Sequence, residues 1–95
     1  MPAYLIVDCE VTDPVQYEKY KQLTPAAIAA HGGRFVVRGG ATEVLEGDWE
    51  PNRVVVIEFP SVAAAKVFYD SPEYLAARAA RKGAARMNMV LAEGL

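Results

Sequence analysis

The sequence predicts an α+β fold with four strands and two helical regions in the order β-α-β-β-α-β. Three observations support this order: polar and apolar residues alternate over 3–11, residues 53–59 form a nearly continuous hydrophobic run, and Asp13 and Ser71 are each followed by proline. Alternation with a period of two is typical of a half-buried strand, and a capping side chain followed by proline is typical of a helix start. The order is that of a ferredoxin-like plait, in which the strands form one antiparallel sheet.

The first helix is expected over residues 14–31. Asp13 stands at its N-cap, and Gln16 three residues later completes a capping box. The Thr-Pro pair at 24–25 is expected to kink or re-cap this helix, because proline disfavours helical backbone in the residue before it. The glycines at 32–33 can adopt the positive φ that ends a helix, so the chain turns there.

Two strands and a turn follow this helix. Residues 34–38 form the second strand, and residues 42–46 are expected to continue it beyond a bulge or tight turn at Gly39-Gly40. The polar segment 47–52 is the expected turn. The third strand, residues 53–59, carries four hydrophobic residues in succession, which predicts a central place in the sheet with cover on both faces.

Two shorter helices and a strand complete the chain. Ser61 caps a helix that runs to about Tyr69, and Ser71 caps another that runs to Gly83. The last strand is expected over residues 87–92. These helices, together with the first, can cover only one face of a four-stranded sheet.

The composition describes one folded domain, residues 1–95. The chain is 53% hydrophobic and 23% charged, unlike a disordered chain. Its 10 basic and 12 acidic residues give a net charge of −2, which offers no basic surface for nucleic acid. No apolar run approaches the roughly 20 residues of a membrane span, so we expect a cytoplasmic protein with no membrane contact. One cysteine, Cys9, and one histidine, His31, cannot build a zinc site, and we expect neither metal nor cofactor.

The sheet face without helices, here called the open face, is expected to meet a second copy of the chain. Strand parity assigns to it Tyr4, Ile6, Asp8, Glu10, Arg34, Val36, Arg38, Val54, Val56, Glu58, Asn88, Val90 and Ala92. This mixture of β-branched and charged residues is typical of a covered face that holds an internal polar site. Folding buries only about 64% of the surface of so small a chain, so a homodimer would add core that the monomer lacks.

Several segments of the sequence together resemble the domain-of-unknown-function family 1330. They are Gly32–Gly40, Leu45–Trp49, Val55–Ser61, and Phe68–Tyr74 with Arg78, in this order over nearly the whole chain. The family is similar to the dimeric α+β barrel group, in which ferredoxin-like protomers pair their sheets. That group includes cofactor-independent monooxygenases, lactone isomerases and haem enzymes. The resemblance implies this fold and a homodimer, and it implies no reaction because the role of the family is unassigned.

Arg38 is the first candidate binding residue. On the open face and followed by two glycines, its guanidinium could reach a carboxylate in a barrel pocket. The alternative is an ion pair with Glu58 or Asp8 on the same face.

A second candidate cluster comprises Tyr69, Tyr74 and Arg78. Tyr74 and Arg78 are four residues apart and share one helix face, so a phenol and a guanidinium could point together toward a ligand. The alternative is that these side chains stack on each other in the core or at an interface.

Trp49 and His31 are the remaining candidates. Trp49 in its polar loop could be a lid over a pocket or an anchor in the partner subunit. His31 has the only side chain with an ordinary pKa near neutrality, which makes it a candidate proton acceptor. The alternative for His31 is a structural one, because a helix C-terminus favours histidine there.

Two functions stay open at this point. In the first, a dimeric barrel binds a small polar or anionic molecule between sheet and helices and converts it without a cofactor. In the second, the homodimer is a non-catalytic binding or structural module. The sequence holds no nucleophile elbow, phosphate-binding loop or zinc motif, so it does not establish that the protein is an enzyme.

Overall fold

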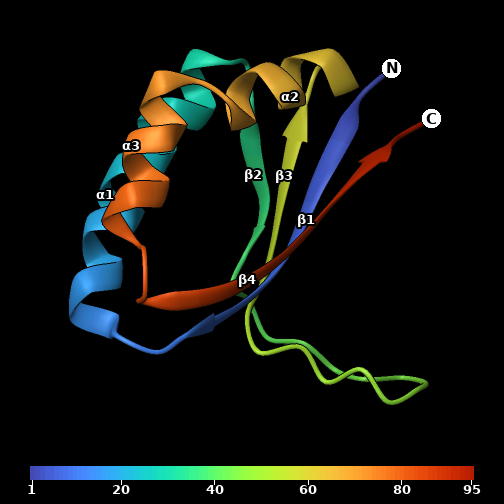
Figure 1. Ribbon diagram of the computed structural model, residues 1–95. Helices are drawn as coiled ribbons and strands as arrows, with labels where there is room; N and C mark the ends of the chain where they lie inside the picture. The colour runs from blue at the N-terminus through green and yellow to red at the C-terminus, as the bar shows by residue number, and fades with distance from the viewer.

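One antiparallel sheet with helices on a single face forms the molecule, and the computed structural model describes all of residues 1–95 (Figure 1). The elements are β1 Ala3–Val11, α1 Pro14–Ala30, β2 Arg34–Arg38, β3 Val54–Phe59, α2 Val62–Tyr69, α3 Pro72–Ala80 and β4 Ala85–Glu93. The strand order is β2-β3-β1-β4, and all neighbouring strands are antiparallel. The predicted ferredoxin-like plait is therefore confirmed. None of the helices is long and apolar enough to cross a membrane.

The first helix spans almost the expected range, and Pro25 lies inside it without ending it. A proline removes one backbone N–H donor from a helix. Thr24, the residue before Pro25, is buried. Its hydroxyl group donates a hydrogen bond to the backbone carbonyl of Tyr20, one turn earlier in α1. At the start of α1, the carboxylate of Asp13 accepts a hydrogen bond from the backbone N–H of Gln16, as the capping pattern predicts.

The expected continuation of the second strand over residues 42–46 is wrong. Residues 39–53 form a long exposed loop that extends away from the body of the molecule (Figure 1). Gly39 starts this loop with a φ of 71°, and its backbone N–H donates to the carbonyl of Val54 at 2.8 Å. The chain leaves the sheet at that point, so residues 42–46 have no strand to pair with. The third helix also ends at Ala80, before the expected Gly83.

Aromatic rings and small residues fill the space between sheet and helices at the α2 end. Phe68 is fully buried, with its ring centroid 4.9 Å from that of Phe59 and 4.4 Å from that of Tyr74. A Cβ atom on Gly33 would lie 2.6 Å from Cε1 of Phe59, so this position requires glycine. These contacts hold α2, α3 and β3 together.

A β-bulge in β2 changes which face Arg38 belongs to. Phe35 pairs with Ile57 and Val37 with Val56, so Val36 is an extra residue in the ladder. Because side chains alternate between faces, one extra residue moves every later side chain to the opposite face. The prediction that Arg38 lies on the open face is therefore wrong: Val37 takes the open-face register opposite Val56, and Arg38, opposite Val55, turns toward the helices. Val36, the extra residue, is 48% exposed.

The other open-face residues lie as parity predicts. Register pairs Tyr4 with Glu58, Ile6 with Val56 and Asp8 with Val54. On β2, Arg34 forms an ion pair with Glu58. Glu58, one of the two acidic residues expected as a possible partner of Arg38, therefore pairs with Arg34 instead.

Candidate functional site

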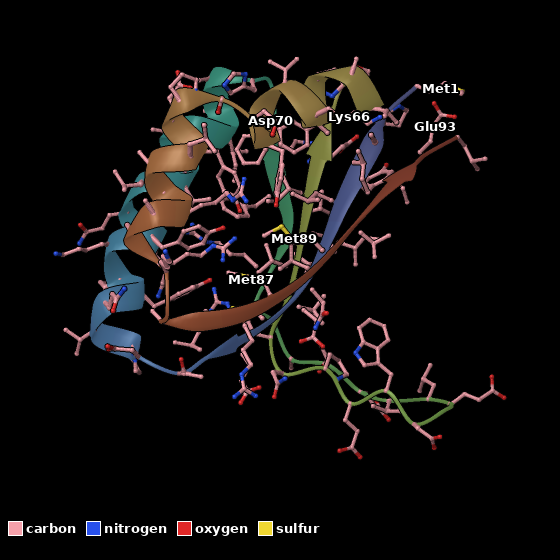
Figure 2. The ribbon with its side chains drawn as sticks, viewed as in Figure 1. Met1, Lys66, Asp70, Met87, Met89 and Glu93 are labelled. Carbon is pink, nitrogen blue, oxygen red and sulfur yellow. The ribbon has the colours of Figure 1, made fainter.

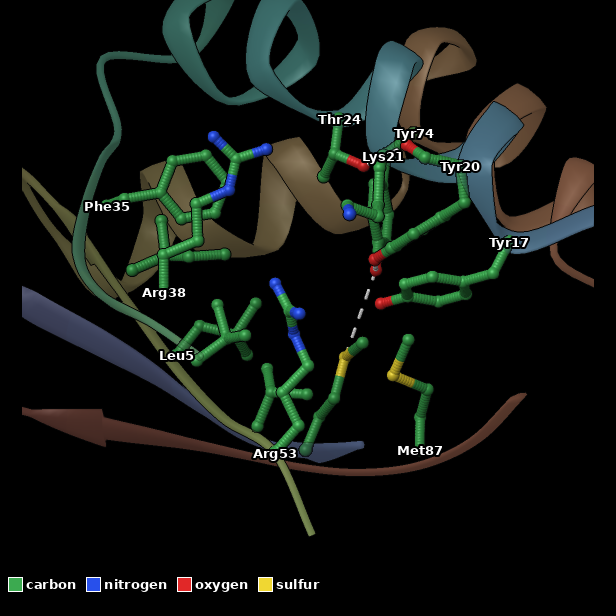
Figure 3. A pocket seen from close by; sticks show the side chains of 14 residues that line it. Leu5, Tyr17, Tyr20, Lys21, Thr24, Phe35, Arg38, Arg53, Tyr74 and Met87 are labelled. Carbon is green, nitrogen blue, oxygen red and sulfur yellow. Dashed lines mark hydrogen bonds between the residues drawn. The ribbon is translucent and has the colours of Figure 1, made fainter. Parts of the chain in front are cut away.

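A cavity lies between the sheet and α1 and α3, and we call it the cationic cavity (Figure 3). Its apolar lining comes from strand residues facing the helices: Leu5, Val7, Phe35, Val55, Ile57, Met87 and Met89. Its polar lining comes from both sides: Tyr17, Tyr20, Lys21, Thr24, Arg38, Arg53 and Tyr74. The cavity is thus on the helix side of the sheet, opposite the open face.

Three cations and no carboxylate line the cationic cavity. Lys21 enters from α1, Arg38 from the end of β2 and Arg53 from the residue before β3 (Figure 3). The Arg38 guanidinium lies 4.4 Å above the ring centroid of Phe35. The Nε atom of Arg53 is buried and has no hydrogen-bond partner. Buried charged groups are normally paired, so an unpaired guanidinium nitrogen here is unusual.

The absence of a side chain at Gly39 lets the Arg53 guanidinium lie against the backbone there. A Cβ atom on Gly39 would lie 2.8 Å from Cζ of Arg53, and the φ of Gly39 is positive. Glycine therefore serves two purposes there: it starts the long loop and it leaves space for the guanidinium.

Tyr17, Tyr20 and Tyr74 contribute phenol groups to the helix side of the cavity. The hydroxyl groups of Tyr20 and Tyr74 are 2.7 Å apart and share a hydrogen bond. Burial raises the pKa of Tyr20, and the adjacent Tyr74 raises it further. Burial likewise raises the pKa of Tyr17, with a further contribution from Cys9. The phenols of Tyr17 and Tyr20 therefore stay protonated near neutral pH and can donate hydrogen bonds.

The cationic cavity is narrow. The space open to the centres of water molecules is about 40 Å³. One water needs roughly 10–15 Å³ in the same measure. The cavity thus fits a small anionic group such as a carboxylate, and the rest of a ligand would extend beyond it.

The structure brings the predicted cluster of Tyr69, Tyr74 and Arg78 together, but only Tyr74 lines the cationic cavity. The ring centroids of Tyr69 and Tyr74 are 5.7 Å apart. The Arg78 guanidinium lies 4.4 Å above the Tyr69 ring centroid. Arg78 therefore stacks on the aromatic cluster from outside the cavity.

Trp49 lies in the long loop, away from the cationic cavity. Its indole N–H donates to Oδ2 of Asp8 at 3.0 Å, and the backbone N–H of Asn52 donates to Oδ1 at 2.9 Å. These two bonds tie the base of the loop to β1. They also lower the pKa of Asp8, with the indole as the larger cause.

We expect acid to release this attachment. The folded-state pKa of Asp8 is below its ordinary value of 3.8, so the attachment is present above 3.8 and is lost as the pH falls through the lower folded value. Trp49 is the one tryptophan of the chain, so its fluorescence should titrate with a midpoint below 3.8. Far-UV circular dichroism over the same range separates loop release from unfolding, and Asp8→Asn should remove the transition.

His31 lies half-buried where α1 ends, also outside the cationic cavity. Its Nε2 atom is 3.6 Å from Oε2 of Glu73 on α3, and its ring meets Phe68 edge-on at 6.1 Å. The pKa of Glu73 is lowered mainly by its own backbone N–H and further by His31. The histidine thus links the end of α1 to the start of α3.

Sequence reasoning missed several cavity residues, namely Tyr17, Tyr20, Lys21, Arg53, Met87 and Met89. A signal for the α1 residues is present: positions 17, 20, 21 and 24 follow the i, i+3, i+4, i+7 pattern of one helix face. Arg53 shares strand parity with Val55 and Ile57, both of which face the helices. No group of histidine, cysteine and acidic residues in the structure could hold a metal ion.

The family described as "Domain of unknown function (DUF1330)" matches residues 2–95. No curated protein matches the chain.

Solved structures with the same fold include the following three. A protein of unknown function from Rhodopseudomonas palustris is 23% identical with a TM-score of 0.77, over 99% of this chain and 82% of that one. SnoaB, a cofactor-independent oxygenase from Streptomyces nogalater, is 19% identical with a TM-score of 0.67, over 99% and 93%. A dimeric protein of unknown function with a ferredoxin-like fold from Bacteroides fragilis is 18% identical with a TM-score of 0.62, over 98% and 96%. These identities show a shared fold.

Proposed function

This chain belongs to the DUF1330 family, and we propose that its cationic cavity binds a small molecule through an anionic group such as a carboxylate. The observation that carries the proposal is the lining of Lys21, Arg38 and Arg53 without any acidic residue. In the whole chain, acidic residues outnumber basic ones by 12 to 10, so this local excess of positive charge is a feature of the cavity. Cations in a low-dielectric cleft attract and hold anions.

The hydrogen-bonding groups of the cavity support the same proposal. Arginine and lysine only donate, and the hydroxyl pair of Tyr20 and Tyr74 has one O–H beyond their mutual bond, whose only other contact is the Met89 sulfur at 4.0 Å. The hydroxyl group of Thr24 is occupied by the carbonyl of Tyr20. Donors outnumber acceptors in this lining and three of them are cationic, which fits an oxyanion better than a neutral amide or an amine.

The lining favours binding over proton-transfer catalysis. The side chains that most often remove a proton are imidazole and carboxylate groups, and neither lines the cationic cavity. His31 and Cys9 both lie outside it. Burial raises the pKa of two phenols of the cavity, Tyr17 and Tyr20, which makes them poorer proton acceptors at neutral pH. Any reaction would have to rely on the cationic and hydroxyl donors to stabilise an oxyanion of the bound molecule. The base would come from solvent or from the substrate itself.

The charge preference can be measured with two molecules of the same shape. Butyrate should bind at least about tenfold more tightly than butyramide, since a charge-assisted hydrogen bond contributes about 1.5–3 kcal/mol. Chemical-shift titration by NMR detects the weak binding expected of such small ligands. The shifts should map to the cavity residues Lys21, Arg53 and Tyr74. Equal affinities, or shifts elsewhere on the surface, would overturn the proposal.

We also propose that the protein is a homodimer joined through its open face. The molecule exposes 6049 Å², against about 5,400 Å² expected for a folded monomer of this mass. Val90 on this face is 62% exposed, and the neighbouring Ile6 and Val56 are only half-buried. A second copy seated here would cover this apolar strip, and a structural neighbour from Bacteroides fragilis is described as dimeric.

Sedimentation equilibrium tests the dimer directly. At micromolar concentration the mass should be twice the 10.3 kDa of one chain. Val90→Asp places a charge on the open face and should shift the equilibrium to monomer, because an unpaired charge is costly to bury. Val67→Asp is the matched control, since Val67 is 60% exposed on the outer side of α2 and should leave the dimer intact. A monomeric wild type would refute this assignment.

A further inference from the structure

A second cavity lies beside the cationic cavity, beneath α2, and we call it the α2 cavity. The two cavities share the side chains of Leu5 and Met89, so these residues form the partition between them. Beyond the partition, the walls are Ala65, Tyr69 and Leu91. Lys66 on α2 and Asp70, the residue that ends this helix, complete the lining (Figure 2). The two cavities therefore lie end to end between sheet and helices.

The two cavities differ in size and chemistry. The space open to the centres of water molecules is about 240 Å³ in the α2 cavity, against about 40 Å³ in the cationic cavity. The cationic cavity fits a charged head group and little more, while the α2 cavity has room for a larger body. Its rim carries Lys66 and Asp70, whose opposite charges give no preference for a second charge. Its walls are otherwise apolar or aromatic.

Met89 is the member of the partition whose side chain can change conformation most easily. It points from β4 into the space beneath the helices (Figure 2). Its one polar contact is weak, with Sδ 4.0 Å from the hydroxyl oxygen of Tyr74. Methionine is unbranched and adapts its shape to its neighbours at low cost. A rotamer change at Met89 would open its side of the partition, beside Leu5, without a change in the backbone.

We propose that the two cavities form one elongated site for an amphipathic anion, with the anionic group among Lys21, Arg38 and Arg53 and a neutral apolar tail passing Met89 onto Tyr69 and Leu91. This inference rests on the proposed function of the cationic cavity and adds the class of ligand: a carboxylate with an uncharged, apolar chain or ring. Burying such a tail releases apolar surface from water, which supplies affinity that the small head group cannot.

A series of straight-chain carboxylates tests the tail. From butyrate to octanoate, affinity measured by NMR or calorimetry should rise about two- to fourfold for each added methylene group. The longer acids should shift the resonances of Ala65 and Leu91, whereas butyrate should not. Affinity that stays flat from butyrate to octanoate would overturn the elongated site.

Filling the α2 cavity provides the second arm of the test. Ala65→Leu should reduce the affinity for octanoate to that for butyrate and leave butyrate binding unchanged. Ala63→Leu is the matched control, because Ala63 is exposed on the same helix and lies outside both cavities. Since a larger residue can strain a packed site, Leu91→Phe fills the same cavity from β4 and should give the same result. Octanoate binding unaffected by both variants would refute the placement of the tail.

The corresponding 1-alkanols separate failure of the tail site from failure of the anion site. If affinity for alkanols rises with length but carboxylates bind no better than alkanols, the α2 cavity binds tails and the cationic cavity does not select anions. If butyrate binds and length adds nothing in either series, the anion site stands and the elongated site falls. If chain length adds no affinity in either series and butyrate binds no more tightly than butyramide, both the anion site and the elongated site are wrong.

Discussion

Replacement of Phe68 by alanine should remove about 3–5 kcal/mol from the free energy of unfolding. Phe68 has 0% exposure and packs its ring on Phe59 and Tyr74, so the change would leave a cavity at the junction of α2, α3 and β3. Domains of this kind have total stabilities of roughly 5–15 kcal/mol, so the loss is a large share of the whole. The thermal midpoint should fall by at least about 12 °C.

Urea unfolding at fixed protein concentration measures this loss, since dimerisation would otherwise add a concentration-dependent term. The matched control is Val67→Ala, one residue earlier on the same helix but 60% exposed, which should change stability by less than about 0.5 kcal/mol. A Phe68→Ala protein within about 1 kcal/mol of wild type would mean that the aromatic cluster is not the centre of the core.

Arg53→Gln should weaken the binding of butyrate by about 10- to 100-fold while leaving the protein as stable as before, or more stable. The side chain is half-buried, lies against Gly39, and has a buried Nε atom without a partner. In the unliganded protein an unpaired buried cation contributes no stabilising bond, so its removal costs little. With an anion bound, the same nitrogen gains its missing acceptor.

This pairing of lost binding with retained stability is the signature of a binding residue. Thermal unfolding and NMR titration of the same sample measure both. Arg78→Gln removes the same charge from a guanidinium that stacks on Tyr69 outside the cationic cavity, and it should keep butyrate affinity. If Arg53→Gln destabilises the fold and binds butyrate normally, then Arg53 has a structural role.

The fold was predictable from the sequence because its signals are local. The alternation over residues 3–11 and the caps at Asp13, Ser61 and Ser71 each depend on neighbouring residues, and each gives the observed element. The strand expected over 42–46 failed because a strand needs a partner in space. The chain leaves the sheet at Gly39, and local pattern carries no information about that departure.

The site was predictable only in part. Tyr74 and Arg38 were singled out and do line the cationic cavity, but Arg38 was assigned to the wrong face. Tyr20, Lys21 and Arg53 escaped notice because each has ordinary surroundings in the sequence. Their significance arises when α1, β2 and β3 converge on one cavity, and that convergence is a tertiary property.

The bulge at Val36 has a consequence for how relatives of this chain should be compared. A homologue that lacked the extra residue would keep its arginine opposite the counterpart of Val55, on the helix side, whereas a strand of the same length without a bulge would turn that arginine to the open face. An ungapped alignment with such a regular strand would pair the cavity-facing Arg38 with an open-face residue. The presence of the bulge therefore decides which face of the sheet this arginine occupies, and the identity of the residue alone does not.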